Sequence, residues 1–118
     1  MSADRRRTPR VRVYHPVRVH RLAPTQLVET LTKDLSLGGI RCISTLPFPI
    51  ATELQLELML FAGEEPLVLG GHTVWFQFVP SGEQYELGIA FDALSPQHER
   101  RLSVYFKNIS RQLTPSSA

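Results

Sequence analysis

Alternation of apolar and polar residues with a period of two is the feature that most limits how this chain can fold. It is strictest in residues 52–61, where a leucine stands at every second position from Leu54 to Leu60. The intervening residues are Glu, Gln and Met, which together with Leu are good helix formers. A period of two, however, places the leucines on one face of a strand and scatters them around a helix. The pattern therefore predicts a half-buried strand.

Similar alternation, or a run rich in β-branched and aromatic residues, recurs in five other segments. We expect six strands, at residues 11–20, 23–33, 40–43, 52–61, 67–79 and 85–91. The segments between them are short and carry the Pro, Gly, Asp and Ser residues of turns. Within the long fifth segment, Gly70 and Gly71 indicate a bend or bulge. Short antiparallel strands in succession predict a small closed or nearly closed barrel.

The pattern changes from strand to helix after Asp92. Ser95 suits the N-cap position of a helix and Pro96 its first helical position. The apolar residues that follow have the spacing of one helical face: Leu102, Tyr105, Phe106, Ile109 and Leu113. We expect an amphipathic helix at 95–113 that covers an open end or an edge of the barrel. The predicted fold class is all-β with one C-terminal helix.

Composition excludes several kinds of protein. The chain has 118 residues, enough for one domain, and its single cysteine, Cys42, has no partner for an internal disulfide. No apolar run approaches the roughly 20 residues of a membrane helix, and no secretory signal is present. We therefore expect a cytoplasmic protein with no membrane insertion. Nucleophile-elbow, metalloprotease and Walker motifs are absent, and Ser36 has no evident histidine base, so we expect no enzyme, metal or cofactor.

Positive charge is concentrated at the N-terminus. Residues 1–21 contain seven arginines and one acid, whereas the other 97 residues contain six Lys or Arg and ten Asp or Glu. Residues 1–10 have few apolar side chains and predict a flexible basic arm that precedes a domain at 11–114. Arginine offers a planar fork for phosphate and a face that stacks on a base. The arm is thus either a site for an anionic ligand or a solvated basic tail.

A second informative segment, KDLSLGGIRC at residues 33–42, joins two predicted strands. Asp34 and Ser36 are short polar side chains that bond the backbone of turns, and Gly38 and Gly39 permit close approach to the backbone. One interpretation is a tight β-turn with local hydrogen bonds. The other is a binding site, since a carboxylate accepts hydrogen bonds from the N1–H and exocyclic amine of guanine. A flat ring would then lie on the glycine pair.

Together these segments resemble the PilZ domain family. RRTPR, residues 6–10, matches the R-x-x-x-R arm of that family, and DLSLGG, residues 34–39, matches its D/N-x-S-x-x-G motif. YELGIAF, residues 85–91, is similar to its closing G-x-x-F strand. The resemblance covers nearly the whole chain, including the order of six strands and a final helix.

The resemblance implies a fold and a ligand. PilZ domains are bacterial receptors for cyclic di-GMP, built on a six-stranded antiparallel β-barrel. By resemblance, Arg6 and Arg10 would contact phosphates and guanine faces. Asp34, Ser36 and Gly39 would contact a guanine. In such domains the residue before the arm motif, here Arg5, influences whether one or two ligand molecules bind, and its charge leads us to expect two. The expected ligand-binding residues are Arg5, Arg6, Arg10, Asp34, Ser36, Gly38 and Gly39.

A receptor of this kind would pass its signal to an unidentified effector protein through ordering of the arginine arm. One alternative is a ligand-free adaptor of the same fold. A less favoured alternative is a barrel that binds single-stranded nucleic acid, which needs exposed aromatic residues beside basic ones. Here the aromatics Trp75, Phe76 and Phe78 stand in an acidic part of the chain, and we expect no DNA binding.

Overall fold

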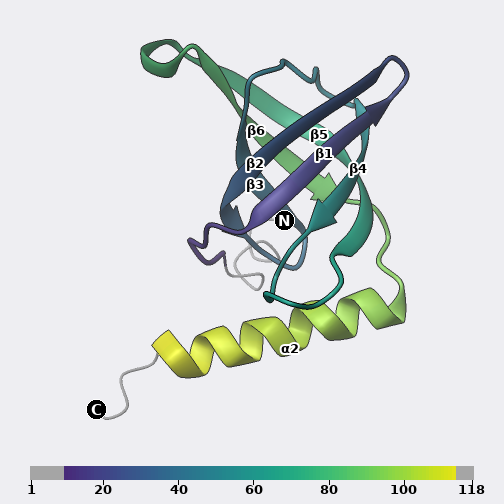
Figure 1. The fold of residues 1–118 in the computed structure, drawn as a ribbon, viewed down its shortest axis with the longest axis vertical. Coiled ribbons are helices and arrows are strands. Elements are labelled where there is room, and N and C mark those ends of the chain that lie inside the picture. Colours follow the sequence, from purple (N-terminus) through teal and green to yellow (C-terminus); the bar gives the residue numbers. More distant parts are fainter. Residues whose placement is uncertain (1–9, 114–118) are drawn as a thin grey trace, which may run out of the picture.

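The computed structural model describes residues 10–113, with side chains as far as Ile109. Six antiparallel strands close into one barrel in the order β1-β2-β3-β6-β5-β4 (Figure 1). The strands are β1 (Pro16–Leu22), β2 (Thr25–Leu35), β3 (Gly39–Ser44), β4 (Glu53–Leu58), β5 (Leu67–Val79) and β6 (Gln84–Phe91). A 3-10 turn (Pro80–Gly82) joins β5 to β6, and helix α2 (Pro96–Leu113) follows. The predicted fold class is confirmed.

Apolar side chains that alternate along the strands fill the barrel interior. The leucines that predicted the fourth strand, Leu54 to Leu60, are all buried, although β4 itself ends at Leu58. Val17 and Val19 on β1 face them, because these strands pair with Val19 opposite Leu56. Cys42 is buried among them, and burial raises the pKa of its thiol to about 12. The period of two therefore placed this part of the core correctly.

Helix α2 lies across one end of the barrel (Figure 1). Ser95 caps it, since its Oγ accepts a hydrogen bond from the His98 N–H at 3.1 Å. The α2 side chains Leu102 and Tyr105 are fully buried and belong to the hydrophobic core. The Tyr105 hydroxyl lies 2.5 Å from Nε2 of His15, the residue before β1. A side-chain hydrogen bond therefore links the helix to the segment that leads into the first strand. Within residues 10–113, no helix is long and apolar enough to cross a membrane.

One local expectation was wrong, and the structure excludes one of the two alternatives expected at Gly70 and Gly71. The first strand begins at Pro16 rather than at residue 11, and the residues before it run beside the end of β2, where Val11 and Leu35 exchange two backbone hydrogen bonds of 3.0 Å. The glycines of β5 mark no bulge, because β4 pairs in register across both. They mark a close approach instead: a Cβ at Gly71 would lie 2.7 Å from the carbonyl oxygen of Ala90.

Candidate ligand-binding site

A β-bulge in β2 turns Asp34 to the outside of the barrel. Thr32 is fully buried and pairs with Cys42, and a strict period of two would point Asp34 inward as well. The register shifts between Thr32 and Asp34, so that Lys33 is an extra residue and Asp34 pairs with Arg41. Directly opposed residues of an antiparallel pair share a face. Asp34 and Arg41 therefore both lie on the outer surface.

A second bulge in β5 does the same for Trp75. Thr73 is fully buried opposite Ile89, and the register then shifts so that Trp75 pairs with Gly88. Val74 is the extra residue. Bulges commonly re-aim a side chain beside a functional site, and here two bulges, on strands at either side of the β3–β6 pair, turn their side chains to the same surface.

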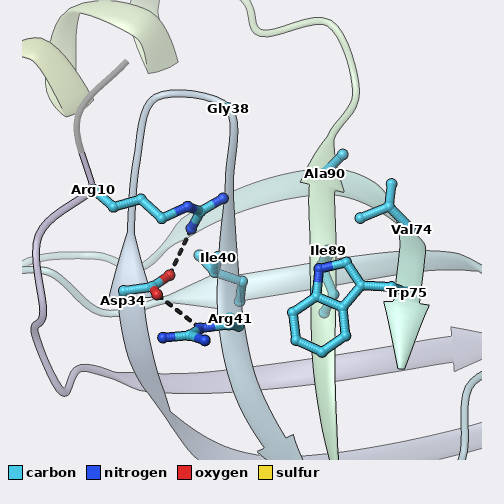
Figure 2. A pocket seen from close by; sticks show the side chains of 10 residues that line it. Arg10, Asp34, Gly38, Ile40, Arg41, Val74, Trp75, Ile89 and Ala90 are labelled. Atoms are coloured by element: carbon cyan, nitrogen blue, oxygen red, sulfur yellow. Dashed lines mark hydrogen bonds and ion pairs between the residues drawn. The ribbon is translucent and has the colours of Figure 1, made fainter. Parts of the chain in front are cut away.

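The two re-aimed residues border one cavity of about 360 Å³ (Figure 2). Asp34, Arg41, Gly88 and Trp75 form a single register row across β2, β3, β6 and β5. The cavity lies over this row. Its lining consists of Arg10, Asp34, Gly38, Ile40, Arg41, Val74, Trp75, Gly88, Ile89 and Ala90.

Gly88 allows the indole of Trp75 to lie across β6. A Cβ at Gly88 would be 2.3 Å from Nε1 of Trp75, a distance that no packing tolerates. Gly88, in the YELGIAF segment, thus leaves room for the Trp75 side chain, which forms an aromatic wall of the cavity. Indole offers a large apolar face for stacking.

Opposite this wall, Asp34 is held by two arginines. Arg10 donates from Nη1 to Oδ1 at 2.5 Å, and Nε of Arg41 lies 2.8 Å from Oδ2. The Arg41 contact is an ion pair without hydrogen-bond alignment. Only 5% of the Asp34 side chain is exposed, against 49% for Arg10 and 35% for Arg41. The carboxylate is therefore buried, whereas each of its two charge partners is partly exposed.

The charge pairs continue away from the cavity through Glu86 on β6. Its Oε2 accepts a hydrogen bond from Nζ of Lys33 at 2.7 Å and lies 3.8 Å from Nη1 of Arg41. Opposite charges thus alternate from Lys33 through Glu86, Arg41 and Asp34 to Arg10. The bulge residue Lys33 is the far end of this network.

Of the other turn residues predicted to bind ligand, Gly38 lines the cavity, whereas Ser36 and Gly39 contact the backbone. Ser36 is buried and accepts a hydrogen bond on Oγ from the Gly38 N–H at 3.1 Å, as the interpretation of a tight turn predicts. Gly39 is a contact with β6, since a Cβ there would lie 2.1 Å from the carbonyl oxygen of Ile89. Neither Ser36 nor Gly39 lines the cavity, whereas Gly38 does.

Of the residues predicted from sequence, the structure brings Arg10, Asp34 and Gly38 together. Arg5 and Arg6 lie outside the described residues, as does most of the predicted arm at 1–10. Sequence reasoning missed Arg41, Trp75 and Gly88. Two of these stand inside segments that had been singled out, KDLSLGGIRC and YELGIAF, but their alignment in one row depends on bulges that no motif signals.

The site combines guanidinium groups, a buried carboxylate and an indole. This set suits a ligand that carries an anionic group and a flat ring with hydrogen-bond donors on its edge. Residues 10–113 contain no group of three or more side chains placed to hold a metal ion.

Comparisons with solved structures agree with the barrel fold. No curated protein sequence matches the chain. Among solved structures, Escherichia coli YcgR in complex with cyclic di-GMP superposes with a TM-score of 0.75 at 20% identity, covering 92% of this chain and 47% of that one. Bacillus subtilis MotI/DgrA gives 0.72 at 15% identity, covering 91% and 52%. The chain thus spans about half the length of these two proteins.

A shorter solved structure, the PilZ domain of Escherichia coli YcgR with cyclic di-GMP, gives a TM-score of 0.70 at 19% identity and covers 92% of this chain and 93% of that one. These likenesses establish the fold. The family model for the PilZ domain matches residues 4–108. The barrel, its closing helix and this match over most of the sequence show that the chain belongs to the PilZ domain family.

Proposed function

We propose that this protein is a receptor for cyclic di-GMP that passes the signal to a partner protein. Family membership supports the proposal, as do the cyclic di-GMP complexes of YcgR and of its PilZ domain. The observation that carries it is the cavity, which has the buried carboxylate of Asp34 at one end and the indole of Trp75 at the other, with Arg41 and Gly88 between them. A carboxylate suits the hydrogen-bond donors on the edge of a guanine base, and an indole suits its flat face.

Each part of the ligand has a counterpart in the site. The Asp34 carboxylate accepts from the N1–H and exocyclic amine of one guanine, and Trp75 offers a ring to stack on. The guanidinium of Arg10 binds phosphate or lies on a base, together with Arg6 and Arg5 from the preceding segment. Ser36 and Gly39 act through the backbone by holding the turn that carries Gly38.

Arg10 is the group beside Asp34 that we expect to move on binding. Its guanidinium donates a hydrogen bond to Oδ1 of Asp34, and its movement would expose this oxygen to a guanine edge. Arg10 is half exposed and lies outside the strands, which makes it the movable partner. We propose that the ligand draws Arg10 and the residues before it over the cavity. The rearranged arm then forms part of the surface that an effector protein recognises.

Calorimetric titration tests the proposal, with cyclic di-GMP, GTP and a short single-stranded RNA as parallel ligands. We expect saturable binding of cyclic di-GMP and weak or no binding of the others. Binding of RNA in preference to cyclic di-GMP would show a nucleic-acid-binding barrel instead. Hydrogen exchange supplies a second readout: amides of residues 5–8 and of Arg10 should exchange quickly in the free protein and slowly in the complex.

One observation favours a second function, a protein-binding adaptor that needs no ligand. Phe76 and Phe78 on β5 expose 39% and 49% of their surface, and their ring centroids lie 6.2 Å and 5.3 Å from that of Tyr85 on β6. Exposed apolar side chains that lie together commonly mark protein contacts. Absence of cyclic di-GMP binding at millimolar concentration would favour this adaptor role.

A further inference from the structure

The two arginines that hold Asp34 differ in how firmly they are themselves held. Arg10 is 49% exposed and precedes the first strand. Arg41 is in the middle of β3, which pairs with β2 on one side and β6 on the other. Its guanidinium is also flanked by Glu86, whose side chain is only 15% exposed and bonds Lys33. Arg10 is therefore the less constrained partner of Asp34, and Arg41 is the more constrained one.

A buried carboxylate that loses all its partners is strongly destabilising. If Arg10 were the sole partner of Asp34, moving it to a ligand would leave the carboxylate uncompensated until the guanine edge arrived. Arg41 removes this difficulty, because it stays on Oδ2 while Oδ1 becomes available. Lys33, the extra residue of the bulge that turns Asp34 outward, is bonded to the same Glu86.

From this arrangement we infer that Arg41, held in place by Glu86, is a positioning residue that keeps Asp34 paired and aimed into the cavity when Arg10 is exchanged for ligand. The inference deepens the proposed function and rests on it for the identity of the ligand. Arg41 and Glu86 act through Asp34 on base recognition, whereas Arg10 acts on the ligand directly. Substitutions at the two places should therefore have different signatures.

The first test needs no ligand. It is a double-mutant cycle in thermal stability with Arg10→Ala and Arg41→Gln. Arg10→Ala alone should lower the melting temperature by less than about 2 °C, because Arg41 keeps the carboxylate paired. The melting temperature of the double variant should fall by several degrees more than the sum of the two single decreases, because the buried Asp34 carboxylate then has no charge partner. In an Asp34→Asn background this excess should disappear, and additive losses in the native background would overturn the inference.

The second test measures base discrimination, as the ratio of affinities for cyclic di-GMP and cyclic di-IMP, which lacks the exocyclic amine. Glu86→Gln should lower this ratio by about fivefold or more, the value of one misplaced hydrogen bond. Arg10→Ala should weaken both ligands alike and leave the ratio unchanged. The matched control is Glu57→Gln, which alters a similar ion pair with Arg18 on the other side of the barrel. It should change neither the two affinities nor their ratio.

The two tests separate the inference from the function on which it rests. A native protein that binds neither dinucleotide refutes the proposed function, and the stability cycle alone then decides whether Arg41 is the lasting partner of Asp34. Normal binding with an unchanged ratio in Glu86→Gln refutes the positioning role and leaves the receptor function intact. A fall in stability without a change in the ratio would show that Glu86 is merely structural.

Discussion

Asp34 on β2 and Trp75 on β5 lie at the two ends of one register row, with Arg41 and Gly88 between them. Each end residue follows a β-bulge that turns it away from the barrel interior. The cavity over the row has a carboxylate with its arginines at one end and an indole at the other. In the receptor function that we propose, the carboxylate would recognise a guanine edge and the indole would stack on its ring, from opposite walls of the cavity.

The Asp34 carboxylate should determine which purine binds. It accepts hydrogen bonds from guanine and would be repelled by the lone pair at N1 of adenine. We expect strong preference for cyclic di-GMP over cyclic di-AMP in the native protein, and loss of that preference in Asp34→Ala. Competitive calorimetry measures it. Equal affinity of the native protein for the two ligands would contradict the assignment.

Removal of Arg10 should weaken binding far more than it affects folding. A charge-assisted hydrogen bond is worth about 1.5–3 kcal/mol, so Arg10→Ala should reduce affinity by on the order of tenfold or more. An Arg6→Ala/Arg10→Ala double variant should bind still more weakly. Normal affinity in the double variant, measured by calorimetry, would show that the arm does not contact the ligand.

Gly88→Ala should damage the site from beneath. The added methyl group overlaps Nε1 of Trp75, so the indole must leave its seat on β6. We expect a changed tryptophan emission spectrum, loss of ligand affinity and destabilisation by about 1–3 kcal/mol. Gly82→Ala is the control, because a methyl group there meets only the flexible side chain of Gln84 at 3.2 Å. An unchanged Trp75 spectrum in Gly88→Ala would contradict the packing described here.

Arg5 should influence ligand stoichiometry. Two stacked cyclic di-GMP molecules carry four phosphate charges, and Arg5, Arg6, Arg7 and Arg10 supply up to four positive charges within six residues. We expect two ligands per chain in the native protein and fewer in Arg5→Leu. Titration with known active concentration measures the ratio. A native ratio near one that Arg5→Leu leaves unaltered would reject the two-ligand mode.

Stability should fall in mild acid because of His15. Burial beside Tyr105 lowers the pKa of His15 from its ordinary 6.5, so below that pH the unfolded chain takes up a proton that the folded protein resists. The contribution of neutral His15 to the free energy of unfolding is then complete above pH 6.5. It decreases as the pH drops from 6.5 toward the lowered pKa of His15 in the folded protein. The melting temperature of His15→Gln should depend less on pH across this window. His98→Gln, near the start of α2, is the control.

The strand and helix periods of the sequence determined the architecture. A period of two over residues 52–61 and a helical spacing from Leu102 to Ile109 identify the faces that are buried, because burial of apolar side chains decides how each element packs. The Ser95 cap and the turn from Ser36 to Gly39 were likewise predictable, since their hydrogen bonds are local. Caps, turns and alternation depend on residues that are close together in the sequence, so they can be predicted from the sequence alone.

Only the tertiary structure decided how the site is assembled. Period-two alternation would place Asp34 inside with Thr32 and Trp75 inside with Thr73, yet both residues face outward. The reason is that a bulge depends on the pairing of two strands, which no single segment specifies. The same pairing brings Arg41 to Asp34 and places Gly88 beneath Trp75. The motifs named Arg10, Asp34 and Gly38. The register across four strands then placed Asp34 in one row with three residues that no motif had named, Arg41, Gly88 and Trp75.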